Sequence, residues 1–406
     1  MNLLFAWRYF RAKKSTNAIN IIAWVSMSAI IVGATSLILV LSVFNGFEDL
    51  VKSLYTSFYP DIRISAAAGK TVTLTPQQLD KLTHIPGVHA LSLVAQERGI
   101  LENGGNHQPA YLKGVDSNFL KVSGVGSKIA SGKFDVGTAD QPLGVLGSGL
   151  EYTLGVQADR ELLPLGVYLF RRSSDFSADP LHSFNHEGMA TAGTFRIQSE
   201  FDDNYVITNI GFIKRMLGLG PDEYTAAEIS VDNPAQTIPV SNLIAQALGS
   251  AYVIQTRYQQ NQSLYNVMST EKWVIYIVLT LILVVAAFNM VGALTMLVWE
   301  KQKDIHVLKA LGANDGLIRK IFMSEGLLLA LMGGLGGILL AVIICALQIK
   351  YKLIPLQGGS FLIDYYPVKL VATDFVLVLS TIIIVALLAS WLPARKAAAQ
   401  PISLKS

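Results

Sequence analysis

Four long stretches without charged residues constrain this chain more than any other feature. No Asp, Glu, Lys or Arg occurs between Lys14 and Glu48 or within 273–299, and two further apolar runs cover 326–349 and 375–394. A helix that crosses a bilayer needs about 20 mostly apolar residues. Each run meets that length, so the chain is expected to cross a membrane four times. The expected transmembrane helices are 19–48, 269–299, 321–349 and 374–394.

The composition supports this class and excludes others. Hydrophobic residues make up 51% of the chain and charged residues only 15%, against about 25% charged residues in an average soluble domain. The 32 Lys and Arg residues are balanced by 29 Asp and Glu residues, so we expect no nucleic-acid partner. The only cysteine, Cys345, excludes an intrachain disulfide and any centre built from several cysteines.

The distribution of basic residues predicts the orientation in the membrane, because short cytoplasmic segments collect Lys and Arg. Basic residues are frequent in 1–18, 300–320 and 395–406. They are scarcer in 350–373. Both termini and 300–320 are therefore expected in the cytoplasm, and 350–373 is expected as a short periplasmic loop. The first span exceeds the apolar core of a cleaved signal peptide, so we expect a retained anchor.

The residues 49–268, between the first two spans, are expected to fold outside the cytoplasm as an α+β domain with two lobes. Residues 61–65 alternate polar and apolar side chains, as a half-buried strand does. A capped helix is predicted after Thr75, with Pro76 at its first position and Gln78 at its third. Further expected strands are 88–101, 110–115, 194–198, 205–208, 227–231 and 252–255, and further helices are 210–217 and 239–248. The least regular stretch is 171–193, which we expect to project as a loop.

The sequence lacks a recognisable catalytic or metal site. Gly132-Lys133 has neither the preceding glycine nor the following hydroxyl of a phosphate-binding loop, and Gly147-Ser148-Gly149 lacks the spacing of a nucleophile elbow. His182 and His186 have the spacing of zinc ligands on a helix, but their surroundings favour a solvated loop. We therefore expect no enzymatic activity, no metal and, because the spans hold almost no ionisable residues, no ion-coupled transport.

The segment between the second and third spans predicts a short amphipathic helix on the cytoplasmic side. Ile305, Leu308 and Leu311 recur at helical spacing. Gly312 suits the left-handed residue that ends a helix, and Asp315 is a suitable cap for the next one. Such a helix either lies on the lipid surface or docks a cytoplasmic protein. Within the third span, the G-x-x-x-G spacing of residues 333 and 337 predicts close packing against a neighbouring helix.

These motifs resemble a known family. The segment 303–313, Lys-Asp-Ile-x-Val-Leu-Lys-Ala-Leu-Gly-Ala, resembles the coupling segment of the MacB/FtsX-type ABC permeases. The segment 41–48, which contains Asn45-Gly46-Phe47, resembles a signature of the LolC/LolE branch. Segments 111–116, 146–156 and 389–398 also match motifs of the family, so the resemblance covers essentially the whole chain. Ala158-Asp159 departs from the Gly-Asp turn that usually follows the motif at 146–156.

The resemblance implies a permease subunit of an ABC transporter in the bacterial inner membrane. Such a subunit extracts lipoproteins and passes them to a periplasmic carrier, driven mechanically by a separate ATPase. The chain itself would bind no cofactor, because the partner ATPase binds ATP and Mg²⁺. The implied partners are a cytoplasmic ATPase dimer, a second permease, a periplasmic carrier and acylated lipoproteins. The second permease is either another copy or a paralogue.

Three groups of residues are expected to carry these roles. ATPase coupling is assigned to Lys303, Asp304, Ile305, Val307, Leu308, Lys309, Leu311, Gly312 and Ala313. A lipid cavity is assigned to Val40, Val43, Phe44, Phe47, Leu264, Tyr265 and Met268, for which ordinary helix packing or lipid contact is an alternative. Carrier binding is assigned to Arg171, Arg172, Phe176, Pro180 and Phe184 of the projecting loop.

Two alternative functions remain open at this point. A relative of the same fold would export another amphiphile. A second kind of relative would transmit ATPase strokes to a periplasmic partner without transporting anything, and it would need no lipid cavity.

Overall fold

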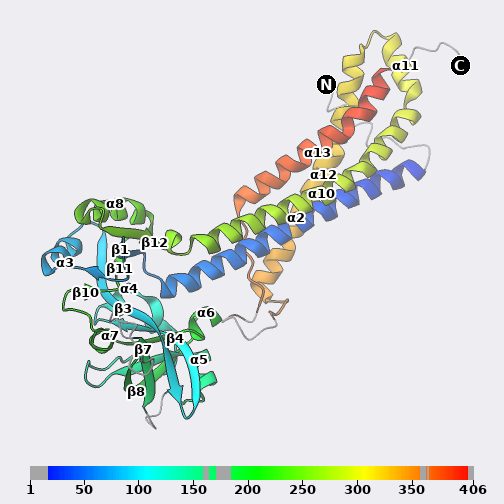
Figure 1. Cartoon of the computed structure of the whole chain (residues 1–406). Helices are drawn as coiled ribbons and strands as arrows, with labels where there is room; N and C mark the ends of the chain where they lie inside the picture. Colours follow the sequence, from blue (N-terminus) through cyan, green and yellow to red (C-terminus); the bar gives the residue numbers. More distant parts are fainter. Residues whose placement is uncertain (1–16, 159–163, 171–183, 357–362, 364, 401–406) are drawn as a thin grey trace, which may run out of the picture. The chain divides into compact units, whose positions relative to one another are not determined.

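The computed structural model describes residues 17–158, 164–170, 184–356, 363 and 365–400. It forms two compact units, which we describe separately (Figure 1). The helical unit contains the chain up to residue 50, residues 266–356 and the residues from 365 onward. The sheet unit is centred on residues 51–265.

Four long helices supply the helical unit, and all four are long and apolar enough to cross a membrane. They are α2 (Asn17–Phe58), α10 (Gln262–Glu300), α12 (Asp315–Tyr351) and α13 (Ala372–Ala398). This confirms the four predicted transmembrane helices. At about 1.5 Å per residue, the 42 residues of α2 and the 39 of α10 exceed the roughly 20 that a bilayer requires. Both helices therefore continue beyond the hydrocarbon layer.

Glycines of α12 allow the helices to pack closely. A Cβ atom on Gly337 would lie 2.6 Å from the carbonyl oxygen of Ile31 in α2 and 2.7 Å from Cβ of Ala34. The hydroxyl of Thr35 also donates a 3.0 Å hydrogen bond to the Gly337 carbonyl. The predicted role of the glycine pair in helix packing is therefore confirmed.

The sheet unit is built on one long mixed sheet and has the predicted α+β architecture. Its strands are β1 (Ile62–Ala66), β2 (Val72–Thr73), β3 (Val88–Asn103), β4 (Asn106–Val115), β5 (Ile129–Gly132), β6 (Leu143–Gly147), β7 (Leu165–Phe170), β8 (Phe184–Phe195), β9 (Tyr205–Asn209), β10 (Glu223–Tyr224), β11 (Ala226–Val231) and β12 (Tyr252–Thr256). Its α-helices are α3 (Pro76–Thr83), α4 (Phe119–Val122), α5 (Ser148–Leu154), α6 (Ser199–Asp202), α7 (Ile210–Leu217), α8 (Thr237–Leu248) and α9 (Arg257–Gln260).

The strand order creates two hydrophobic cores along one sheet. The order is β12-β1-β11-β3-β4-β9-β6-β8-β5, with β7 pairing to β3 and β8, while β10 and β2 form a separate pair. One core contains residues of β3, β4, β6 to β9, α5 and α7. The other contains residues of β1, β11, α3 and α8. Each core defines one lobe of the sheet unit. Half-buried Ile210 packs against both cores, so the two lobes are in contact.

An aromatic cluster fixes the last turns of α2 within the sheet unit. The ring of Phe58 stacks on Phe201 with centroids 4.4 Å apart and meets Tyr205 edge-on at 4.6 Å. Phe58 and Phe201 are fully buried. Burial of large aromatic side chains in contact stabilises such an attachment strongly. The end of α2 is therefore a structural part of the sheet unit and not a flexible linker.

The capped helix predicted after Thr75 is confirmed. The Thr75 side chain accepts a hydrogen bond from the Gln78 N–H, and the Gln78 side chain accepts one from the Thr75 N–H.

Two expectations about residues 171–198 are wrong. The irregular stretch does not extend to Gly193, because β8 already begins at Phe184 and pairs with both β6 and β7. The strand predicted over 194–198 does not extend beyond Phe195, where β8 ends, because the Arg196 N–H donates to the Lys128 carbonyl and the Ile197 N–H donates to the Asp202 side chain.

Candidate functional site

The segment between α10 and α12 forms a short helix, α11 (Gln302–Ala310), as predicted. The backbone hydrogen bonds pass from one helix to the next, since Lys301 N–H donates to Leu297 and Ile305 N–H donates to Lys301. Lys301 and Asp304 form an ion pair at 3.3 Å across one turn. Backbone hydrogen bonds therefore continue from α10 into α11.

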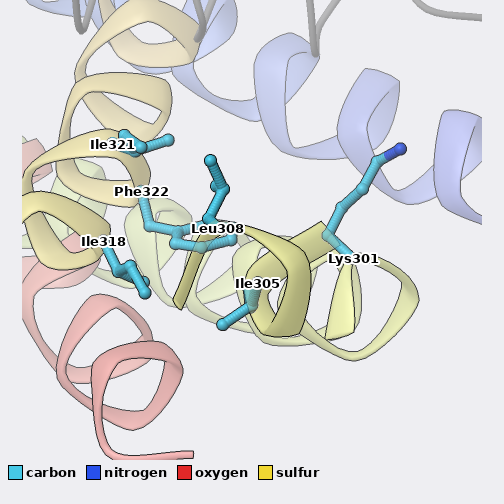
Figure 2. A pocket seen from close by; sticks show the side chains of 6 residues that line it. All are labelled: Lys301, Ile305, Leu308, Ile318, Ile321 and Phe322. Carbon is cyan, nitrogen blue, oxygen red and sulfur yellow. The ribbon is translucent and has the colours of Figure 1, made fainter. Parts of the chain in front are cut away.

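The inner side of α11 is packed on α12. Figure 2 shows Ile305 and Leu308 of α11 around the same small hollow as Ile318, Ile321 and Phe322 of α12. Ile305 is only 2% exposed and belongs to a core that includes residues of α10, α12 and α13. A displacement of α11 therefore has to move the ends of these helices with it.

Lys309 fastens α11 to the end of α13. Its ammonium group donates hydrogen bonds to the carbonyls of Ala398 at 2.7 Å and Gln400 at 2.8 Å. It also lies 2.9 Å from a carboxylate oxygen of Asp315. A cation at the last carbonyls of a helix is favourable because those carbonyls lack helical partners and carry a partial negative charge. The sequence predicted Lys309 as a coupling residue but gave no sign of this partner.

The outer side of α11 presents apolar side chains to solvent. Val307 is 59% exposed and Leu311 is 80% exposed, and the two are four residues apart. Residues at this spacing lie on one helix face. Lys303 and Gly312 are exposed as well, while Ala313 is half-buried. The predicted coupling residues thus divide into an inner group, which anchors the helix, and an outer group, which faces solvent.

The turn after α11 is partly as predicted. Gly312 has a φ of 93°, which is the left-handed geometry expected of it. The predicted cap at Asp315 is wrong, because the Asn314 side chain caps α12 by accepting from the Leu317 N–H at 2.8 Å. Both residue types are good caps, and the extended backbone at Asn314 decides between them. Asp315, the first residue of α12, instead pairs with Lys309.

A second polar cluster in the helical unit surrounds the Asn-Gly-Phe motif of α2. The Asn45 amide donates to the Asp374 carboxylate of α13 at 2.5 Å and accepts from Lys272 of α10 at 2.7 Å. A Cβ atom on Gly46 would lie 2.3 Å from the carbonyl oxygen of Pro367. The motif therefore joins α2 to α10, to α13 and to the segment before α13. Sequence reasoning identified the motif only by resemblance and gave no contacts for it.

The seven predicted cavity residues belong to both units, and their joint role stays a prediction. Phe47 meets the ring of Tyr366 edge-on at 5.8 Å, and Tyr265 stacks on Tyr258 at 4.9 Å. Val40 is 36% exposed. The others are half-buried: Val43, Phe44, Leu264 and Met268. A different apolar groove lies in the helical unit and is lined by Tyr276 of α10 and by residues of α13 that include Val376 and Ile384.

The predicted carrier loop joins β7 to β8. Arg171, Arg172, Phe176 and Pro180 lie outside the described residues. Phe184 begins β8 and pairs across the strands with Phe170, with ring centroids 4.3 Å apart. The base of this loop is therefore a defined β-hairpin.

The described residues provide no group of three or more His, Cys, Asp or Glu side chains that is arranged to hold a metal. His186 lies on β8, where its ring packs on Tyr168, so the solvated loop predicted for it is wrong and it does not lie on the helix that zinc ligation would need. His182 lies outside the described residues. Ser148 begins α5, so residues 147–149 form a helix entry.

Comparison with known proteins finds two family models that match different parts of this chain. A MacB-like periplasmic core domain model matches residues 23–169, and an FtsX-like permease C-terminal model matches residues 276–402. The chain is 27% identical to the lipoprotein-releasing system transmembrane protein LolE of Haemophilus influenzae, over 97% of this chain and 96% of the relative.

Two further relatives extend the comparison. The lipoprotein-releasing system transmembrane protein LolC of Neisseria meningitidis serogroup B is 27% identical, over 97% of this chain and 96% of its own. The macrolide export ATP-binding/permease protein MacB of Acinetobacter baylyi is 23% identical, over 95% of this chain and 57% of its own. The chain is therefore similar to LolC and LolE along nearly its whole length, and the periplasmic core and permease C-terminal models match it in chain order.

Proposed function

We propose that this chain is the transmembrane permease subunit of an ABC transporter that extracts lipoproteins from the bacterial inner membrane and passes them to a periplasmic carrier. The observation that carries the proposal is the two-sided helix α11. Its inner side is fixed to α12 and α13 through Ile305 and Lys309, while its outer side exposes Val307 and Leu311. A helix built in this way transmits a push on its outer side to the membrane helices.

The outer side of α11 suits a protein partner. Two exposed apolar side chains on one helix face bury their surface when they enter a groove of another protein. A separate ATPase is the partner that fits, because the sequence contains no phosphate-binding loop. MacB is described as an ATP-binding/permease protein, and this chain matches only 57% of it. We infer that ATP and Mg²⁺ are bound by a dimer of such ATPase subunits and that this chain binds no cofactor itself.

The chemistry of a lipid anchor explains why a mechanical permease is needed. Each buried CH₂ group of an acyl chain contributes about 0.8 kcal/mol to membrane binding, so a multiply acylated protein does not escape into water. The chains must pass from the bilayer to an apolar cavity and then to an apolar acceptor. We assign the cavity to the predicted residues of α2 and α10 and carrier binding to the loop at Phe184, with a second permease completing the path. Both termini and α11 are assigned to the cytoplasm.

The role of α11 is tested by changing its outer side alone. Leu311→Asp places a charge in the apolar contact, and we expect it to reduce recovery of the ATPase at least about tenfold in a pull-down of the tagged chain from nanodiscs. Leu243→Asp is the matched control, since this leucine is 43% exposed on α8 of the sheet unit. Equal ATPase recovery with Leu311→Asp and with the control would contradict docking at α11.

The transport function is tested by reconstitution. The chain, the ATPase and the second permease found in the pull-down are placed in liposomes with a radiolabelled triacylated lipoprotein. We expect release into the soluble fraction only when ATP and a purified carrier are both present. ATP hydrolysis without lipoprotein release would favour transmission of ATPase strokes without transport. Release of other amphiphiles but not of lipoprotein would favour the export alternative.

A further inference from the structure

A polar pocket lies on one face of the sheet unit. Its floor is formed by Arg63 of β1, by Gln96 and Arg98 of β3 and by Tyr111 of β4. Side chains alternate between the two faces along a strand. The register pairs Arg98 with Tyr111, so these side chains lie on the same face, and the guanidinium of Arg98 lies 5.9 Å from the Tyr111 ring centroid.

A positive charge beneath the pocket is only partly balanced. The buried carboxylate of Glu228 is held mainly by the buried Lys113, whose ammonium group lies 2.8 Å and 3.0 Å from its two oxygens. Arg63 reaches the same carboxylate only at 3.8 Å, and its side chain stays 24% exposed. Burial lowers the pKa of Lys113. The negative charge of Glu228 raises this pKa, and the positive charge of nearby Arg63 lowers it. The single negative charge of Glu228 is therefore shared between Lys113 and Arg63. The charge of Arg63, which lines the pocket, is only partly neutralised.

The rim of the pocket adds two cations, Lys70 and Arg98, of which only Lys70 has an acidic partner. The Lys70 ammonium group lies 3.5 Å from a carboxylate oxygen of Glu97. Among the described residues, no carboxylate lies within ion-pair distance of the guanidinium of Arg98. Arg98 is exposed, and its planar group carries five N–H donors in a geometry that matches a carboxylate. The pocket therefore holds three cations, Arg63, Lys70 and Arg98, against the single rim carboxylate of Glu97.

We propose that this pocket binds an acidic polypeptide segment of a partner protein, through carboxylates held by Arg98 and Arg63. Ser65 and Gln96 line it as further polar side chains that can donate to a carboxylate, whereas the Thr225 hydroxyl already donates to the Val94 carbonyl. None of the described lining residues is Leu, Ile, Val, Met or Phe. A phospholipid would bring acyl chains that such a lining does not accommodate, so a polypeptide fits the pocket better than a lipid headgroup.

The proposal is tested on the full chain in detergent with a fluorescein-labelled hexa-aspartate peptide, measured by fluorescence anisotropy. We expect Arg98→Gln to weaken binding about tenfold, because a hydrogen-bonded charge pair is lost. Arg98→Lys keeps the charge but not the two-pronged geometry and is expected to restore part of the affinity. Arg196→Gln is the matched control, since this exposed arginine lies outside the pocket. Binding should weaken as salt is raised, because exposed charges are screened.

Three results would overturn the proposal: no binding of the peptide by the wild-type chain, equal loss with Arg98→Gln and Arg196→Gln, or binding that Arg63→Gln and Arg98→Gln leave unchanged. Binding of anionic phosphatidylglycerol vesicles that depends on Arg98, without binding of the peptide, would assign the pocket to lipid and would also overturn it. Circular dichroism of each variant shows that it is folded. The assay needs no ATPase or lipoprotein, so its failure is distinct from a failure of the proposed function.

Discussion

Among single residues, Lys309 joins α11 to the end of α13 and to the start of α12. Its ammonium group donates to the carbonyl of Ala398, the last residue of α13, and to that of Gln400 beyond it, and it pairs with Asp315. Only 9% of its side chain is exposed, so water does not readily take over these bonds. Hydrogen bonds to a charged group contribute about 1.5–3 kcal/mol each when one partner is removed. Lys309 is therefore an anchor of the coupling helix and not part of its docking surface.

We expect Lys309→Met to lower the unfolding temperature of the chain in detergent and to raise the number of ATP molecules hydrolysed per lipoprotein released. The ATPase should still bind, because Val307 and Leu311 are unchanged. Lys303→Met is the matched control, since it removes the same charge from an exposed position of α11. If the two variants unfold at the same temperature, the anchoring role of Lys309 is refuted.

At the scale of elements, the packing of α12 on α2 depends on a glycine. A methyl group at Gly337 would meet the backbone of α2 at 2.6 Å, and a backbone atom cannot move aside as a side chain can. We expect Gly337→Ala to force the two helices apart and to lower the unfolding temperature. Gly292→Ala, on α10, is the control, because nothing lies within 4 Å of the added methyl group.

The control should be neutral or slightly stabilising, since alanine is favoured over glycine in a helix by up to about 1 kcal/mol. Thermal unfolding of both variants in the same detergent compares the two effects directly. An equal and small change at both positions would show that α2 and α12 do not pack in the described way.

The sequence predicts local features of these elements better than distant contacts. The uncharged runs, the capping box at Thr75 and the turn at Gly312 follow from neighbouring residues, and the structure confirms them. Strand β8 was partly missed because its small residues carry little strand signal and its pairing with β6 and β7 decides the conformation. The partner of Lys309 was missed because it lies about ninety residues away in the chain. The pocket at Arg98 was missed for the same reason, since it combines β1, the hairpin of β3 and β4, and Thr225, which are far apart in sequence.

At the scale of the whole molecule, helix α2 belongs to both compact units. Residues up to 50 are part of the helical unit, and the helix continues without interruption to Phe58, which is buried in the sheet unit. A continuous helix transmits force along its axis because its backbone hydrogen bonds keep its length fixed. Under the proposed function, work done by the ATPase at α11 has to reach the sheet unit through elements of this kind.

The continuity of α2 therefore predicts an uncoupled variant. Insertion of three glycines after Leu50 interrupts the helix between its two anchored parts, because glycine is a poor helix former and is flexible. We expect normal ATPase binding and ATP hydrolysis but loss of ATP-dependent lipoprotein release in the reconstituted system. The same insertion between Gly104 and Gly105, in the open turn between β3 and β4, is the control and should leave release intact. Unchanged release after the insertion at Leu50 would mean that α2 does not transmit the force generated by ATP hydrolysis. In that case α10 would be the helix that transmits it to the sheet unit.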